Sequence, residues 1–261
     1  MDPQDGVKPI EVGHVLSETF ALIRDRAPTV FGIAFLATLP TRLWIYILPG
    51  LAAPLKLTSY PVALALGAVS AGLVAGVMLL LGEGALVGVA VGKSEGGTVG
   101  FLKSSLPVIR RAPVLLAIAL IDVVGILLGL VWFIIPGMML SLMWSVVGPV
   151  AVAEQTGIVE AFRRSQALTT NTLARIFLLM LAGGLGGGAF VWVARKVAEG
   201  IFGVGSNGLN YPFAPAPFLV GSLIDLLKTG FDLALVCSLY VVLIQRDGGG
   251  PMHQRLNRIF E

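Results

Sequence analysis

The sequence predicts an all-α fold, a polytopic bundle of membrane-spanning helices, because apolar residues dominate the chain in runs long enough to cross a bilayer. Hydrophobic residues make up 56% of its 261 residues and charged residues only 13%. Between Pro28 and Gln245 the charges fall mostly into short gaps between apolar runs of about twenty residues, the length that crosses the hydrocarbon core as a helix. A soluble domain has no means of burying so much apolar surface. We therefore expect about six transmembrane helices, together with amphipathic helices that lie on the cytoplasmic surface.

The expected transmembrane domain covers residues 29–245, with spans at 29–48, 61–91, 112–135, 137–153, 173–194 and 217–245. The second and the last span exceed the length that a straight crossing needs, so we expect them to tilt or to extend into the headgroup region. Residues 246–261 are expected to form a cytoplasmic C-terminal tail.

The third and fourth spans meet at Pro136-Gly137, a pair suited to a tight reversal, since proline ends a helix and glycine permits the turn. A single kinked helix over 112–153 is too long for one crossing. The expectation is a hairpin, with a re-entrant pair as the open alternative.

Residues 1–28 are expected to form an amphipathic helix along the cytoplasmic interface, since Val12, Leu16, Phe20 and Ile23 recur at helical spacing. A second amphipathic helix fits residues 158–168, where apolar and charged residues again occupy opposite faces.

The distribution of lysine and arginine predicts that both termini are cytoplasmic, in the inner membrane of a bacterium. Thirteen cations fall on one side: Lys8, Arg24, Arg26, Lys93, Lys103, Arg110, Arg111, Arg163, Arg164, Arg175, Arg246, Arg255 and Arg258. Four fall on the other: Arg42, Lys56, Arg195 and Lys196. The basic pI of about 9.2 is therefore a topology signal, and no nucleic-acid partner is needed to explain it.

The residues offer no basis for catalysis, a cofactor or a metal site. His14 and His253 lie in opposite terminal regions without ligand-spaced partners, and Cys237 is the single cysteine. No Ser-His-Asp or Cys-His set accompanies the acidic residues. We expect the protein not to be an enzyme.

Glycines cluster within the fifth span and predict close helix packing. Gly183 and Gly187, and Gly184 and Gly188, are four residues apart, a spacing that lets membrane helices approach closely. A phosphate-binding loop would need a strand-to-helix turn and usually a following lysine, which are missing here.

Five ionisable residues inside the spans are expected to form a buried polar cluster: Glu83, Asp122, Asp225, Lys228 and Asp232. Each is costly in the bilayer centre unless it is paired or faces a wet cavity. Spacings of three and four place the last three on one face of their helix, with Lys228 expected as the only cation. The cluster is either a proton, ion or headgroup site or a structural pair that holds helices in register.

Five arginines on the expected cytoplasmic face are candidate contacts for anionic lipids: Arg110, Arg111, Arg163, Arg164 and Arg175. Each such residue contributes about 1 kcal/mol near a charged membrane surface. The alternative is that they only fix the topology.

Several short motifs carry a family resemblance. They are Ile134-Ile135-Pro136-Gly137-Met138, Pro149-Val150-Ala151-Val152-Ala153-Glu154, Glu160-Ala161-Phe162-Arg163-Arg164-Ser165 and Leu168-Thr169, together with Val15-Leu16-Ser17-Glu18-Thr19-Phe20 and Leu39-Pro40. The chain resembles the membrane-domain family named after glycerophosphoryl diester phosphodiesterase, which includes YciC-like bacterial inner-membrane proteins. The resemblance implies a six-helix membrane module and no catalytic residue, since the phosphodiesterase chemistry belongs to a separate soluble barrel.

The functional expectation is a non-enzymatic inner-membrane protein that acts through contacts with membrane lipids or with a membrane-protein partner. The alternative is a small transporter or channel that uses the acidic cluster with Lys228. The sequence does not indicate a substrate, a biological process or an oligomeric state.

Overall fold

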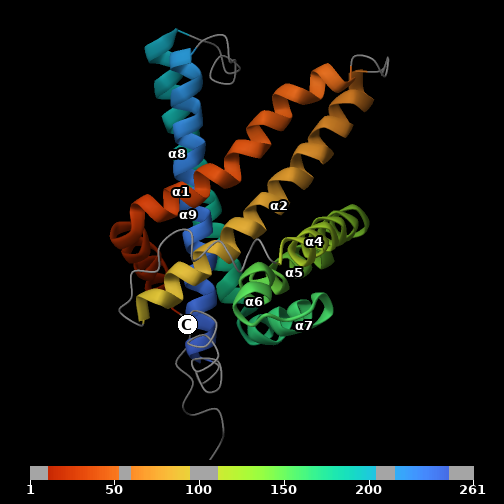
Figure 1. The fold of residues 1–261 in the computed structure, drawn as a ribbon, viewed down its shortest axis with the longest axis vertical. Helices are drawn as coiled ribbons and strands as arrows, with labels where there is room; N and C mark the ends of the chain where they lie inside the picture. The colour runs from red at the N-terminus through yellow and green to blue at the C-terminus, as the bar shows by residue number, and fades with distance from the viewer. Residues whose placement is uncertain (1–10, 53–59, 95–110, 204–214, 247–261) are drawn as a thin grey trace, which may run out of the picture.

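The computed structural model describes residues 11–52, 60–94, 111–203 and 215–246 (Figure 1). This described part is 94% helical and holds no strand, so the expected all-α bundle is confirmed. Four stretches in it are long and apolar enough to cross a membrane: Ser70–Val87, Ile134–Ala153, Ile158–Phe202 and Ala216–Arg246. The chain is a multi-pass membrane protein.

Two pairs of long helices form the frame. Helices α1 (Val12–Ala52) and α2 (Tyr60–Ser94) make one pair, and α8 (Leu173–Phe202) and α9 (Pro215–Arg246) make the other. The pairs cross, and their far ends diverge toward the top of Figure 1. Helix α9 lies at the centre, because it contacts α1, α2 and α8.

The N-terminal amphipathic helix and the first span were expected as two elements, but both lie within the single helix α1. Its only break is a kink at Arg26, whose backbone is non-helical (φ −131°, ψ 27°). Before the kink, Val15, Thr19 and Leu22 are buried in the bundle, whereas Phe20 is 60% exposed. The inward face is therefore rotated from the expected one, and this segment packs against the helix core.

The reversal between the third and fourth spans occurs at Phe133, where the backbone is extended (φ −154°, ψ 121°). It separates α4 (Ala112–Trp132) from α5 (Ile134–Met143). The prediction of a turn at Pro136-Gly137 is wrong by three residues. Pro136 lies in the first turn of α5, where a helix does not need its missing amide hydrogen.

Gly137 instead permits close packing of the hairpin. A Cβ added to Gly129 of α4 would lie 2.7 Å from the Cα of Gly137, so these two helices touch through backbone atoms. The expectation of a hairpin therefore agrees with the arrangement of α4 and α5, which lie side by side in Figure 1.

The expected fourth span, 137–153, is not one helix. Helix α5 ends at Met143, a turn follows, and α6 (Val147–Ala153) begins a fully buried second piece. The amphipathic helix α7 (Ile158–Thr169) then leads through a 3-10 turn (Thr170–Thr172) into α8. The interruption frees the Met143 carbonyl, which accepts hydrogen bonds from the hydroxyls of Ser165 (2.8 Å) and Thr169 (3.2 Å).

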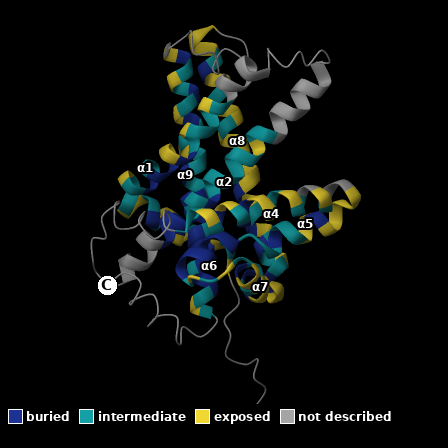
Figure 2. Cartoon of the chain, turned by 45° about the vertical axis from the view of Figure 1, so that its right-hand side comes forward, coloured by how far each residue is buried: buried dark blue, intermediate teal, exposed yellow. Residues whose placement is uncertain are grey.

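Large apolar side chains remain exposed along α4, α5 and α8 (Figure 2), including Trp132 at 76%, Leu185 at 67% and Ile201 at 73%. In a bilayer these faces contact lipid chains. The buried residues gather instead around α6 and the crossing of the two long pairs.

Candidate functional site

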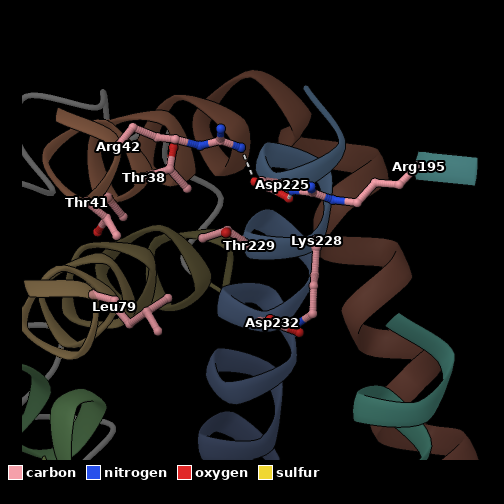
Figure 3. Close-up of a pocket in the computed structure, with 11 residues that line it drawn as sticks. Thr38, Thr41, Arg42, Leu79, Arg195, Asp225, Lys228, Thr229 and Asp232 are labelled. Carbon is pink, nitrogen blue, oxygen red and sulfur yellow. Dashed lines mark hydrogen bonds and ion pairs between the residues drawn. The ribbon is translucent and has the colours of Figure 1, made fainter. Parts of the chain in front are cut away.

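A hollow of about 450 Å³ lies among α1, α2, α8 and α9 (Figure 3). Its polar wall comes from three of these helices and comprises Thr38, Thr41, Arg42, Arg195, Asp225, Lys228, Thr229 and Asp232. Ala37, Ala75 and Leu79 supply an apolar side. We call this the charged hollow.

Asp225 stands between two arginines from different helices. The Nη2 of Arg195 on α8 donates to both of its carboxylate oxygens, at 2.9 and 3.1 Å. Arg42 on α1 donates to the same carboxylate and to the carbonyl of Gly221 at 3.3 Å, and its guanidinium carbon lies 5.8 Å from the Phe218 ring centroid. The expectation that Lys228 is the only cation of the cluster is therefore wrong.

The two guanidinium groups keep hydrogen-bond donors available. Within the described residues, every hydrogen bond that they make uses the Nη2 atom, although each guanidinium carries five N–H donors. Their side chains are 16% and 23% exposed, and both line the hollow. The Nε and Nη1 atoms therefore have N–H donors without an acceptor among the described residues.

Lys228 pairs with Asp232, one turn along the same helix. A Cβ on Gly187 of α8 would lie 3.7 Å from the Cε of Lys228, an ordinary van der Waals distance, so the lysine stem runs beside this glycine. Both charged side chains are about one third exposed, at 34% and 37%. This pair lines the hollow and is not sealed in the bundle, as Figure 3 shows.

The hollow carries a net positive charge when its groups are ionised. Three cations (Arg42, Arg195 and Lys228) face two carboxylates (Asp225 and Asp232), which leaves a charge of +1. Charged groups inside a membrane protein need partners or water. The arrangement therefore suits one additional anionic group.

Glu83 and Asp122 are not part of the hollow's wall. The Oε2 of Glu83 would lie 2.9 Å from a Cβ built on Gly148, which places the carboxylate against α6. Asp122 on α4 has a buried Oδ1 without a hydrogen-bond partner among the described residues. Asp122 and Asp232 both act electrostatically on Glu83, so the five expected residues divide into a hollow and a neighbouring acidic region.

Two of the five candidate lipid-binding arginines are used inside the protein. Arg111 donates to the carbonyls of Ala151 (3.0 Å), Thr156 (2.9 Å) and Gln155 at the end of α6. Partial burial lowers the pKa of its guanidinium, although arginine stays protonated. Arg164 pairs with Glu154 at 3.2 Å.

The other three arginines have different positions. Arg163 is exposed on α7. Arg175 lines a second hollow, together with Arg246, where α8 begins and α9 ends. Arg110 lies outside the described residues.

The glycine cluster on α8 has two unequal faces. A Cβ on Gly183 would lie 2.8 Å from a Leu235 methyl carbon, and Gly187 faces Lys228, so this face packs against α9. Among the described residues, nothing lies within 4 Å of a Cβ added to Gly184 or Gly188. The packing expectation is wrong for these two positions.

Arg42 and Arg195 are not predicted as site residues from the sequence, because the cation count places both in loops. Arg42 does lie inside the expected span 29–48, which was an available signal. Arg195 is one residue beyond the end of 173–194, and only the length of α8 reveals that it belongs to a helix.

Among the described residues, no group of three or more His, Cys, Asp or Glu side chains is arranged to hold a metal ion. No family model, curated protein or solved structure matches the chain.

Proposed function

We propose that this is a non-enzymatic membrane protein that binds a membrane lipid through its headgroup in the charged hollow. The observation that carries the proposal is a net positive hollow, bounded by four helices, in which two arginines retain free donors. Binding sites for small ligands commonly have this size and combine apolar walls with a few fixed polar groups. Binding of anionic lipid, which the sequence led us to expect from surface arginines, is thus assigned in this proposal to Arg42 and Arg195 inside the helix bundle.

The proposed location is the inner membrane of a bacterium, with both termini in the cytoplasm. The support is the cation count. The count is thirteen cations on the proposed cytoplasmic side against four on the other, and two of those four, Arg42 and Arg195, pair with Asp225 within the bundle.

Membership in the membrane-domain family named after glycerophosphoryl diester phosphodiesterase is also part of the proposal. Its supporting residues have structural roles here: Ser165 and Thr169 bind the Met143 carbonyl, and Glu154 pairs with Arg164. These contacts hold α7 against the break between α5 and α6. They favour a membrane module in which the motif residues stabilise the fold and take no part in catalysis.

The test is lipid retention by the full chain, measured by native mass spectrometry after extraction into mild detergent. Arg42→Gln and Arg195→Gln should each lose most of the retained lipid, because each removes one of the two guanidinium groups that have N–H donors left for a ligand. Lys196→Gln is the matched control, since Lys196 is adjacent to Arg195 but pairs with Glu199 away from the hollow. Equal retention by all three variants and the parent would contradict the proposal.

A second candidate function is transport, either as a small transporter or as a channel. It is favoured by one observation, namely that Asp232 lines the hollow and is near enough to Glu83, beside α6, for the two carboxylates to interact electrostatically. Acidic groups at membrane depth often form ion or proton relays. Transport predicts flux across liposomes that Glu83→Gln abolishes while lipid retention is unchanged; lipid binding alone predicts no flux.

A further inference from the structure

We propose that the ligand of the charged hollow is a monoanionic phosphodiester, and that its phosphate takes the place of the Asp225 carboxylate between Arg42 and Arg195. This inference rests on the proposed function and specifies the ligand and its mode of binding. In the unliganded protein Asp225 then acts as an internal substitute for the ligand.

The geometry of the ion pairs provides the first argument. Asp225 presents two oxygens that share one negative charge to guanidinium groups on two different helices. A phosphodiester also presents two non-bridging oxygens that share one negative charge. Guanidinium groups bind carboxylate and phosphate through the same paired N–H donors, so one group can replace the other at this place.

Charge balance provides the second argument. Lys228 lies three residues after Asp225 and four before Asp232, so all three residues share one face of α9. A carboxylate released from the arginines can therefore turn toward Lys228. With one anionic ligand bound, three cations face three anions and the hollow becomes neutral.

The lining of the hollow provides the third argument. About 450 Å³ accommodates a headgroup, and the apolar residues Ala37, Ala75 and Leu79 offer contacts for the glycerol and the start of the acyl chains. Thr229 lies four residues after Asp225 on the same face and adds a hydroxyl near the expected phosphate. A lipid phosphodiester contacts the polar side through its phosphate and the apolar side through its glycerol and acyl chains.

The experiment measures the affinity of the detergent-solubilised full chain for short-chain phosphatidylglycerol, short-chain phosphatidylcholine and water-soluble glycerophosphoglycerol, the same phosphodiester headgroup without acyl chains. The expected order for the parent is phosphatidylglycerol first, with phosphatidylcholine weaker because its choline cation meets a positive hollow. Glycerophosphoglycerol binding as tightly as the lipid would show that the site takes a free phosphodiester, which contradicts the lipid assignment.

Asp225→Asn is the decisive variant, because it removes the internal competitor and raises the net charge of the hollow. Its affinity for phosphatidylglycerol should increase by about tenfold, whereas Arg42→Gln should weaken binding by about tenfold and Lys196→Gln should leave it unchanged. A folded Asp225→Asn protein with unchanged or weaker affinity overturns the inference.

The double variant Arg42→Gln/Asp225→Asn covers the case in which Asp225→Asn alone does not fold. It removes one cation and one anion together and should bind phosphatidylglycerol more tightly than Arg42→Gln alone. If it binds no more tightly, Asp225 is not a competitor. If neither Arg42→Gln nor Arg195→Gln changes binding, the hollow is not the site and the proposed function itself fails.

Discussion

Arginine side chains stabilise two regions of this protein in different ways. Around the break between α5 and α6, Arg111 is engaged by three backbone carbonyls and Arg164 by the carboxylate of Glu154. In the charged hollow, Arg42 and Arg195 share the single carboxylate of Asp225 and bind through one nitrogen each. In the first region the arginines fix the end of α6 and the position of α7. In the second region the arginines line a hollow and have N–H donors without an acceptor in the described part of the chain.

This difference shows that the surroundings of a charge, rather than its presence in the membrane domain, separate a structural role from a binding role. Arg111 binds the carbonyls at the end of α6 and does not line the charged hollow. Arg42 and Arg195 line the hollow, where their remaining N–H donors are available to a ligand. Loss of a cation should therefore have different effects in the two regions. It should lower stability in the first region and weaken ligand binding in the second.

The largest expected effect on stability is in the first region, for Arg111→Gln. The variant removes charge-assisted hydrogen bonds to three carbonyls, including that of Gln155, whose backbone lies in the left-handed region (φ 51°). We expect a loss of about 3 kcal/mol in the free energy of unfolding, measured by thermal or denaturant unfolding in detergent. Arg163→Gln, an exposed neighbour on α7, is the control and should change little. Similar stabilities for the two variants would contradict the structural role assigned to Arg111.

An intermediate effect is expected where α8 packs against α9, from enlarging a glycine of α8. Gly183→Leu places a side chain against Leu235 and should destabilise the bundle by about 1–3 kcal/mol through overpacking. Gly184→Leu, one residue along, points into open space and should be close to neutral. The comparison requires only the melting temperatures of two variants with the same substitution. A reversed order would mean that the other face of α8 packs against protein.

The smallest effect is expected for the Lys228–Asp232 pair. One of the two alternatives from the sequence was a structural pair that holds helices in register; if such a pair is buried, removing one partner costs roughly 3–5 kcal/mol. Because both side chains are about one third exposed in the hollow, we expect an interaction energy nearer 0.5 kcal/mol. A double-mutant cycle with Lys228→Met and Asp232→Asn measures it. An interaction energy of several kcal/mol would show that the hollow is dry and closed.

The helical membrane fold was predictable because long apolar runs admit few other structures in a bilayer. The site was only partly predictable. Spacing placed Asp225, Lys228 and Asp232 on one face of α9, since all three lie on one helix. The pairing of Asp225 with Arg42 and Arg195 depends on how α1 and α8 approach α9, and a single sequence contains no period that encodes this crossing.

The position of the turn at Phe133 escaped prediction for a similar reason. Pro136-Gly137 is the strongest turn signal in that stretch, but proline is also tolerated in the first turn of a helix, and glycine is also useful where helices touch. The close contact between Gly129 and Gly137 indicates that Pro136 serves in the first turn of α5 and that Gly137 serves in helix packing. Packing between the two helices, rather than local preference, determines where the chain reverses.

The α4–α5 hairpin also bears on how the protein enters the membrane during synthesis. From Val123 to Leu140 the chain has no charged residue and no amide or hydroxyl side chain, and Trp132, Phe133, Ile134 and Ile135 at the tip are 67–76% exposed. Insertion of this tip therefore transfers no polar loop through hydrocarbon. Asp122, in the middle of α4, is the one charged residue that the hairpin carries to membrane depth, and Arg111 stays behind at its base.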